Sequence, residues 1–383
     1  MSSETSAVRL PAYGTGSLAE VMPSVAAVLG VPGYDDVLGI QALAGGSFKR
    51  ACVLLIDGLG WNALRAHLDE APTLNAMAGR SITTAFPATT ATSVTTVGTG
   101  LPPGLHGVLG YQVAIPGTGR LMNSLRWDRE VDPLTWQPYE PVLARAAGFG
   151  LAVAHVGPGF HNGSGLTRAS ARGGRFRPAY SLGDLAYGAA DATASADRAL
   201  TYAYFAELDT TGHMRGWQSE AWRAELAQVD LLVRTLRAAL PPDAALVVIA
   251  DHGMIDVPPA GRLDADEWPA LWEGVALLGG EGRARHVYAQ PGAEADVLAA
   301  WTDVLGPDTL VVSRDQAIAD GWFGPKVDDR VRPRIGDVVT APGAGVAVIA
   351  TEAEPLESSL VGLHGGMVPD EQLVPLLVSS GAG

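Results

Sequence analysis

The stretch Ala244-Ala245-Leu246-Val247-Val248-Ile249-Ala250-Asp251-His252-Gly253-Met254 joins an apolar run to two polar side chains that can bind metal ions. A short run of this kind is typical of a strand buried on both faces of a parallel sheet. Neighbours in a regular strand point to opposite faces, so Asp251 and His252 can reach one ion only if the chain turns there. Gly253 permits such a turn. We therefore predict a buried strand followed by a ligand-bearing loop.

Similar short apolar runs recur along the chain, and most of them end near a Gly or an Asp. They cover residues 51–56, 151–156, 201–208, 346–350 and 373–378. A helix is predicted over residues 218–240, because its apolar residues follow the helical period and Pro241 comes directly after it. This alternation of strands and helices predicts an α/β fold with a mainly parallel central sheet.

The length of 383 residues is sufficient for a large buried core. We expect one α/β domain over residues 1–383. The segment from about 258 to 337 is less regular and rich in charged residues, Gly and Pro, which indicates an inserted cap or small lobe.

The formal net charge of -15 argues against binding of nucleic-acid polymers, which depends on Lys and Arg. Bound metal ions could still provide positive charge for a small phosphorylated substrate. The single cysteine, Cys52, lies in an apolar run and is expected in a buried strand. We find no secretion signal and no membrane-spanning run, and therefore expect a cytoplasmic protein without membrane contact. The oligomeric state is not readable from the sequence.

Three further segments place potential metal ligands after apolar runs or between glycines. Asp57 follows the run at 51–56, Asp209 and His213 follow the run at 201–208, and His364 lies in Gly362-Leu363-His364-Gly365-Gly366. Ligands of open α/β sheets bind beyond the carboxyl ends of the strands, which is where the first two segments are expected. Asp209 and His213 could approach one ion from a helical turn or from a tight loop.

These segments together contain three Asp and three His side chains. Mixed carboxylate and imidazole ligands suit Zn²⁺ or a similar ion such as Mn²⁺. Six ligands exceed what one tetrahedral site needs and suit two neighbouring divalent ions. Two such ions commonly hold the attacking and leaving oxygens during phosphoryl transfer.

A segment rich in hydroxyl groups, residues 83–100, offers candidate nucleophiles. Pro87 and Gly98 bound a short predicted helix within it. A hydroxyl at the start of this helix would lie beside backbone N–H groups that attract an anion. The same hydroxyls could instead bond to carbonyl groups of their own helix, and composition does not decide between these roles.

In their order and surroundings, these motifs resemble the alkaline phosphatase superfamily, and within it the type I phosphodiesterase/nucleotide pyrophosphatase family. The resemblance implies a three-layer sandwich with helices on both faces of the sheet. It implies that Asp209, His213 and His364 hold one ion, and that Asp57, Asp251, His252 and the oxygen of Thr90 hold the other. Thr90 is implied as the nucleophile by its spacing from the run Thr99-Gly100-Leu101 to His106-Gly107, with Thr89 as the alternative.

The chain departs from the diesterase pattern in three places. Ala91, Thr92 and Ser93 replace the usual Phe-Pro-Asn after the nucleophile, and Tyr111 lies near the position of an Asn that helps to hold the phosphate. A hydroxyl from Ser93 or Tyr111 is expected to keep that contact with substrate. The glycines around His364 are more similar to the phosphomutase-type members of the superfamily. No Cys/Ser-x-Pro-x-Arg segment surrounds Cys52 or Thr90, which argues against a sulfatase.

The resemblance implies a metal-dependent phosphoester hydrolase of the phosphodiesterase or nucleotide pyrophosphatase type, which works through a phosphothreonine intermediate on a small phosphorylated metabolite. A phosphomonoesterase and a phosphotransferase or phosphomutase-like enzyme on the same two-metal site are the alternatives. A metal-binding module without catalysis is a third alternative, and the intact Thr90 argues against it.

Overall fold

Strand β1 (Arg50–Ile56) lies inside a seven-stranded sheet, between β7 (Ala199–Phe205) and β8 (Ala244–Ile249). The computed structural model describes residues 8–381. The remaining strands are β17 (Leu373–Ser380) and β2 (Ala78–Thr83) beyond β8, and β5 (Ala152–Pro158) and β6 (Arg175–Ala179) beyond β7. Only β17 runs antiparallel to its neighbours in this sheet. The predicted α/β fold with a mainly parallel sheet is confirmed.

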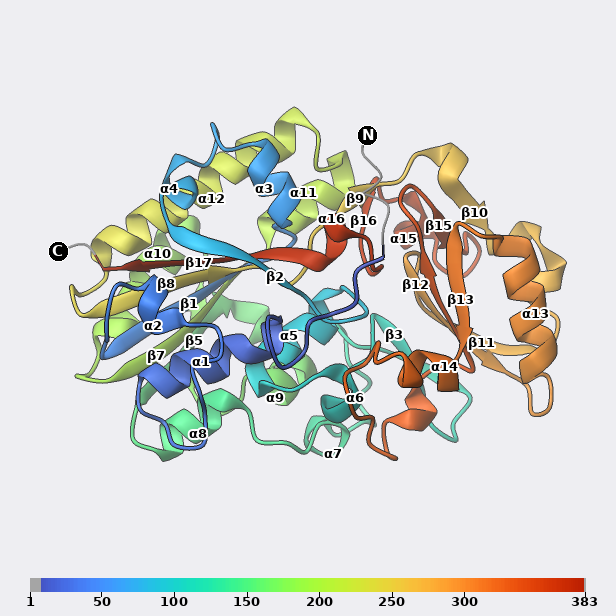
Figure 1. The fold of residues 1–383 in the computed structure, drawn as a ribbon, viewed down its shortest axis with the longest axis horizontal. Helices are drawn as coiled ribbons and strands as arrows, with labels where there is room; N and C mark the ends of the chain where they lie inside the picture. The colour runs from blue at the N-terminus through green and yellow to red at the C-terminus, as the bar shows by residue number, and fades with distance from the viewer. Residues whose placement is uncertain (1–7, 382–383) are drawn as a thin grey trace.

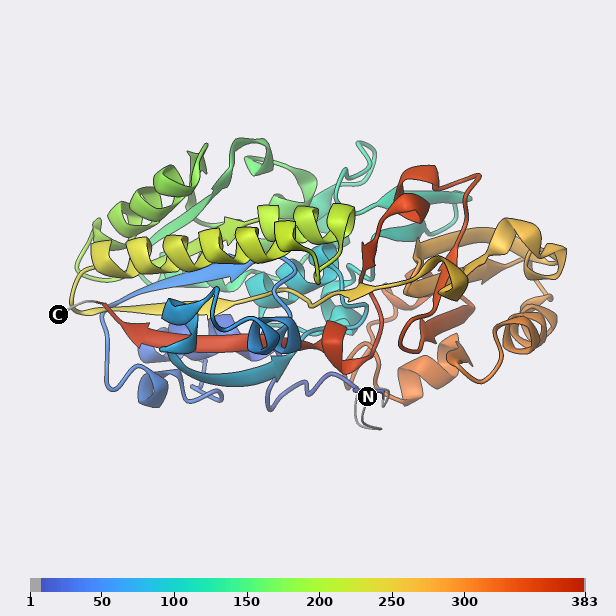
Figure 2. The ribbon, with the colours of Figure 1, turned by 90° about the horizontal axis from the view of Figure 1, so that it is seen from above.

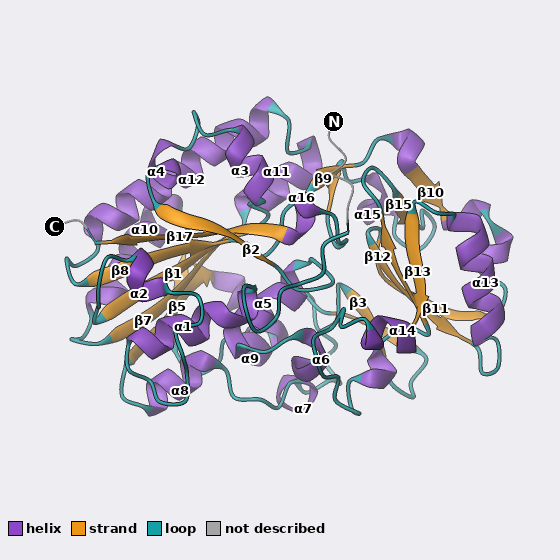
Figure 3. Ribbon diagram, viewed as in Figure 1, coloured by secondary structure: helices purple, strands orange, loops and turns teal. Residues whose placement is uncertain are grey.

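Helices cover both faces of this sheet (Figures 1 and 2). One face carries α10 (Leu182–Ala194) and α12 (Glu220–Ala239), and the other carries α1 (Val21–Val28), α5 (Thr90–Thr99) and α8 (Val142–Gly148). Shorter helices complete the two layers (Figure 3): α2 (Ile40–Leu43), α3 (Trp61–Ala66), α4 (Pro72–Asn75), α6 (Pro103–His106), α7 (Pro133–Trp136), α9 (Gly165–Ser170), α11 (Glu207–Arg215) and α16 (Pro369–Gln372). No helix in the described part of the chain combines the length and apolar character needed to cross a membrane.

Helix α12 matches the predicted helix closely. The Ser219 side chain accepts a hydrogen bond from the Trp222 backbone N–H and caps its start, and Pro241 follows its end. The apolar residues of its inner face, from Trp222 to Leu236, are buried. Helix α5 departs slightly from its prediction, because it continues through Gly98 and ends at Thr99, where Gly100 adopts the left-handed conformation.

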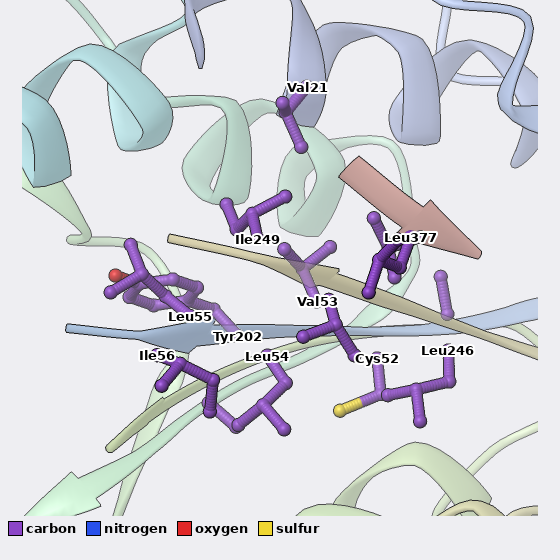
Figure 4. Close-up of a cluster of buried hydrophobic side chains, with 14 of the residues drawn as sticks. Val21, Cys52, Val53, Leu54, Leu55, Ile56, Tyr202, Leu246, Ile249 and Leu377 are labelled. Carbon is purple, nitrogen blue, oxygen red and sulfur yellow. The ribbon is translucent and has the colours of Figure 1, made fainter. Parts of the chain in front are cut away.

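The core of the sheet consists of the predicted apolar runs. Every residue from Ala51 to Ile56 is fully buried, and Val53 and Leu54 pack with Leu246 and Ile249 of the neighbouring strand (Figure 4). Burying a side chain of this size contributes roughly 1.5–3 kcal/mol, so the runs strongly favour a central position. Cys52 lies in this core, as predicted.

A second, four-stranded sheet lies beside the carboxyl ends of the central strands (Figure 1). Its order is β11 (Val275–Glu281), β12 (Ala284–Ala289), β14 (Val338–Pro342) and β13 (Thr309–Ser313), with α13 (Glu294–Leu305) and α14 (Arg314–Ala319) packed on it. Because β14 belongs to this sheet, the irregular segment expected at residues 258–337 continues structurally to Pro342.

Short strand pairs connect the two sheets. They are β3 (Gln112–Ile115) with β4 (Arg120–Asn123), β9 (Ile255–Asp256) with β16 (Gly362–Leu363), and β10 (Arg262–Asp264) with β15 (Ala347–Ile349). The apolar run at residues 346–350 is therefore a strand outside the central sheet, buried against β10 and the loop at Gly282. Helix α15 (Pro355–Ser359) follows it and lies near the junction of the two sheets.

Candidate active site

Three carboxylates meet at the carboxyl ends of the three central strands. The parallel register pairs Ile56 with Phe205 and Leu55 with Ile249, so β1, β7 and β8 end at the same edge of the sheet. Asp57 and Asp251 follow β1 and β8, while Asp209 lies in the first turn of α11. Strand pairing thus brings these three acidic side chains close together, although they lie far apart in the sequence.

Two glycines make this close approach possible. Gly58 has a left-handed φ of 74°, and a Cβ atom there would lie 3.0 Å from Asp209. Gly253 is needed for a different reason from the turn expected at this position: a Cβ atom there would lie 1.9 Å from the carbonyl oxygen of Asp370. Glycine is therefore required after His252 mainly because a side chain there would collide with the backbone of Asp370.

The three histidines are oriented by backbone carbonyl groups. The Nδ1 atom of His213 lies 2.8 Å from the Gly362 oxygen, that of His252 lies 3.0 Å from the Gly253 oxygen, and that of His364 lies 3.0 Å from the Ala88 oxygen. We infer from these contacts that each Nδ1 carries a proton and donates it. Each Nε2 atom then presents a lone pair, which is the form in which histidine binds a metal ion.

The Nε2 atoms point to the carboxylates and form two groups. In the first group, His213 Nε2 lies 3.3 Å from Asp209 Oδ2 and 3.2 Å from His364 Nε2. In the second, His252 Nε2 lies 3.4 Å from Asp57 Oδ1 and 3.6 Å from an oxygen of Asp251. The ligand atoms of Asp57, Asp209 and His252 all lie within 4.8 Å of one another, as do those of Asp209, His213 and His364. Asp209 therefore connects the two groups.

This arrangement fits bound cations. Asp57 Oδ1, Asp209 Oδ1 and Asp251 Oδ2 are buried and have no hydrogen-bond partner among the described residues. Burial, reinforced by the neighbouring carboxylates, raises the pKa of Asp57 well above its ordinary value, and burial raises that of Asp251. The Nε2 lone pairs of His213 and His364 also face each other and repel. Positive ions between these atoms would relieve each of these costs, and the mixed Asp and His ligands suit zinc-like ions.

Thr90 begins helix α5 beside the second group. Its Oγ1 atom lies 3.3 Å from His252 Nε2. No side chain caps this helix, so the backbone N–H groups of its first turn remain able to bind an anion. The neighbouring Thr89 hydroxyl is used differently, because it donates to Glu281 Oε2 at 3.0 Å.

The two other predicted substrate contacts have different positions. Ser93 is fully buried, and its Oγ atom lies 2.8 Å from Thr84 Oγ1, which in turn donates to the carbonyl oxygen of Asp251. Ser93 therefore supports the chain at Asp251 and does not line either cavity at the site. Tyr111 does line a cavity at the site, and its hydroxyl donates to Glu357 Oε1 at 2.8 Å.

Two cavities open beside Thr90, and both are also lined by Asp209. The His213 cavity has a volume of about 330 Å³ and borders His213, His364 and Tyr111. The His161 cavity has a volume of about 420 Å³ and borders Asp57 and a group of aromatic and histidine side chains, namely His155, Phe160, His161, Tyr202 and Tyr204. A ligand held at Thr90 can thus extend in two directions.

Tyr204 and Glu281 also line the site, and no sequence pattern points to either of them. Tyr204 donates to Asp57, and the pKa of Glu281 is raised to about 8 by burial. Glu281 belongs to the second sheet and reaches Thr89 only through tertiary structure. Arg285 lines the His213 cavity, whereas its neighbour His286 is buried between the Leu109 oxygen and the Gly336 N–H group. His106 lies 2.9 Å from Thr96 Oγ1 and supports the turn after α5.

Comparison with solved structures shows the same fold in proteins of low sequence identity. Murine ectonucleotide pyrophosphatase/phosphodiesterase 5 aligns with a TM-score of 0.69 at 18% identity, over 86% of this chain and 88% of its own. Phosphonoacetate hydrolase from Sinorhizobium meliloti 1021, in complex with phosphonoformate, aligns with a TM-score of 0.67 at 19% identity, over 87% of this chain and 90% of its own. Both likenesses support the alkaline-phosphatase-like fold.

The sequence itself gives a family match. No curated protein matches the chain. Residues 51–367, however, match the family described as type I phosphodiesterase / nucleotide pyrophosphatase. This range includes β1, helix α5 and the six Asp and His residues of the two groups. The chain therefore belongs to the type I phosphodiesterase/nucleotide pyrophosphatase family.

Proposed function

We propose that this protein is a metal-dependent phosphodiester hydrolase in which the Thr90 hydroxyl is the nucleophile. The observation that carries the proposal is the position of Thr90 Oγ1, 3.3 Å from His252 Nε2 at the uncapped start of α5. Family membership supports hydrolysis of a phosphoester. An inactive threonine-to-alanine variant of murine ectonucleotide pyrophosphatase/phosphodiesterase 5 has been solved in complex with AMP, which is consistent with a nucleophilic threonine in this fold.

Two divalent ions, Zn²⁺ or Mn²⁺, would be held by the two groups of ligands. Asp209, His213 and His364 would hold one ion. Asp57, Asp251 and His252 would hold the other, with the Thr90 oxygen beside it. Bound there, the ions would supply positive charge to the attacking and leaving oxygens of the phosphoryl group.

The residues of the chain then perform two successive displacements. Thr90 Oγ1 loses its proton to solvent and forms a bond to phosphorus, while the bond from phosphorus to the leaving oxygen breaks. The leaving oxygen takes up a proton from water. A water molecule next attacks the phosphothreonine, which releases the phosphate product and restores the Thr90 hydroxyl. The first backbone N–H groups of α5 bind a non-bridging oxygen as its negative charge increases.

The two cavities favour a diester over a monoester. A diester carries an organic group on each side of phosphorus, and Thr90 lies between two cavities of comparable volume. A monoester would occupy only one of them. Tyr111 lines the His213 cavity, so its hydroxyl is positioned to contact the substrate, whereas Ser93 acts from behind Asp251.

Hydrolysis of bis(4-nitrophenyl) phosphate and of 4-nitrophenyl phosphate, each with protein loaded with Zn²⁺ or Mn²⁺, tests this proposal. We expect the diester to give the higher kcat/KM, and Thr90→Ala to remove the activity. A preference for the monoester would identify a phosphomonoesterase on the same site. Phosphoryl transfer to an added alcohol in place of water would identify a phosphotransferase. Bound metal without turnover of either ester would contradict catalysis altogether.

A further inference from the structure

The His213 cavity lies on the side of the site where the leaving group is expected. It borders Asp209, His213 and His364, and Asp57, Asp251 and His252 are not among its lining residues. Thr90 Oγ1 lies by His252. In an in-line displacement the leaving oxygen is opposite the attacking oxygen, so it faces the Asp209 group and the His213 cavity. This assignment rests on the proposed function.

Besides Asp209 Oδ1 of the candidate metal site, three buried polar atoms of residues lining this cavity have no hydrogen-bond partner among the described residues. They are Arg285 Nη1, Glu281 Oε1 and Ser358 Oγ. Arg285 is 1% exposed and is already held in place, since its Nε donates to the Val348 oxygen at 2.9 Å and its Nη2 lies 2.8 Å from Glu354 Oε2. One unpaired donor, one carboxyl oxygen and one hydroxyl are therefore available to a ligand that both donates and accepts hydrogen bonds. Leaving such atoms unpaired is costly.

The charged side chains that line the cavity restrict the charge that such a ligand can carry. Arg285 is neutralised by Glu354. Glu357 accepts a hydrogen bond from the uncharged Tyr111 hydroxyl, and no cationic side chain forms an ion pair with it among the described residues. The ion proposed at Asp209, His213 and His364 would face the leaving oxygen itself. An anionic substituent elsewhere on the leaving group would meet the Glu357 carboxylate, whereas a neutral or cationic substituent would not be repelled by it.

The remaining wall is apolar and matches a carbon skeleton. Met214 and Ile349 line it, together with Leu356, Leu360 and Leu363. We propose that the His213 cavity binds the leaving alcohol of the diester, and that this alcohol carries additional hydroxyl or amino groups on a short carbon chain and no negative charge. The bond from phosphorus to this alcohol breaks as Thr90 Oγ1 bonds to phosphorus, and the alcohol oxygen is protonated by water.

Three diesters of adenosine 5′-monophosphate with leaving alcohols of similar size test this inference. The alcohols are ethylene glycol, ethanolamine and glycolate, which are neutral, cationic and anionic, while the retained nucleotide is constant. AMP release is measured with metal-loaded protein. We expect kcat/KM for the glycol and ethanolamine diesters to exceed that for the glycolate diester at least tenfold. A faster ethanolamine diester, or equal rates for it and the glycol diester, both support the proposal.

A charge-removing variant tests the cause of this preference. Glu357→Gln is expected to raise kcat/KM for the glycolate diester. The ratio of kcat/KM between the glycol diester and the glycolate diester should therefore become smaller. Glu352→Gln removes the same charge from an exposed position outside the cavity and is expected to leave the ratio unchanged. A ratio that does not respond to Glu357→Gln, or responds equally to Glu352→Gln, would overturn the role of the cavity charge.

Bis(4-nitrophenyl) phosphate separates failure of this inference from failure of the proposed function. Its leaving group has no charged or hydroxyl substituent, so its hydrolysis depends on the metal site and Thr90 alone. If it is hydrolysed while the glycolate diester is cleaved as fast as the other two, or while no diester yields AMP, only the leaving-group inference is wrong. If it is not hydrolysed, the proposed function is wrong.

Discussion

Glu281 Oε2, at the end of a strand in the second sheet, accepts a hydrogen bond of 3.0 Å from Thr89 Oγ1. This contact joins the second sheet to the residue that precedes the proposed nucleophile. It also occupies the Thr89 hydroxyl, so that of two adjacent threonines only Thr90 directs its oxygen to His252. The second sheet thus helps to decide which of the two hydroxyl groups faces His252.

Replacing Thr90 with alanine is expected to lower kcat for bis(4-nitrophenyl) phosphate at least about a thousandfold, because the attacking oxygen is removed. Metal content, measured by elemental mass spectrometry, should stay close to that of the unmodified protein, since all six Asp and His ligands remain. Thr89→Ala is the matched control and should retain most of the activity. Loss of activity in Thr89→Ala with full activity in Thr90→Ala would transfer the nucleophile to Thr89.

The variant His364→Ala should lose metal. The His364 Nε2 atom lies 3.2 Å from His213 Nε2, and its removal leaves the Asp209 group with too few ligands for tight binding. We expect the metal content to fall by about one ion per chain and the activity to fall with it. His67, which packs against Trp217 and Trp222, provides a control, because His67→Gln should keep the full metal content. Unchanged metal binding in His364→Ala would contradict the ligand assignment.

Removing the metal with a chelator should make stability depend on pH in a defined direction. Burial raises the pKa of Glu281 from 4.5 to about 8, and the pKa values of Asp57 and Asp251 are also raised. A raised pKa means that the folded state binds more protons than the unfolded state, so stability falls as the pH increases. Buried histidines such as His106 and His286, whose pKa values are lowered, have the opposite effect below their ordinary pKa of 6.5. We therefore expect the Tm of the metal-free protein to decrease between pH 6.5 and about 8, where these histidines are neutral in both states.

Two comparisons check this pH effect. In Glu281→Gln the decrease in Tm of the metal-free protein should be shallower, because a neutral amide replaces one of the titrating groups. Restoring Zn²⁺ should raise the Tm most at the upper end of the pH range, where the carboxylates are ionised and bind the ion; ligand present at 100 times its Kd stabilises by about 2.7 kcal/mol. A Tm of the metal-free protein that rises over this range would disprove the explanation.

Ser93→Ala distinguishes support of the site from contact with the substrate. The Ser93 hydroxyl lies 2.8 Å from Thr84 Oγ1, behind the Asp251 backbone. Its loss should reduce the free energy of unfolding by about 1 kcal/mol, the usual contribution of one buried hydrogen bond. The KM for bis(4-nitrophenyl) phosphate should stay the same. Urea denaturation and steady-state kinetics measure the two quantities, and a large rise in KM would restore Ser93 as a substrate contact.

The sequence by itself determined the sheet and the residue types of the candidate metal site. Runs such as 51–56 and 244–250 are apolar enough to require burial on both faces, so a parallel sheet covered by helices follows from local composition. Asp57 and Asp251 come directly after two of these runs, and parallel strands end at one edge, so their convergence was predictable. The sequence left open whether Asp209 and His213 lie on a helix or on a loop. In the structure both lie in helix α11.

Tertiary structure alone decided what surrounds these ligands. No sequence pattern indicates that Glu281 reaches Thr89, that Ser93 turns to Thr84, or that the run at 346–350 pairs with β10 outside the central sheet. The same holds for the unpaired Nη1 atom of Arg285 beside the His213 cavity. Each of these contacts depends on the packing of segments that lie far apart in the chain, and local periodicity carries no information about which distant side chain will fill a given space.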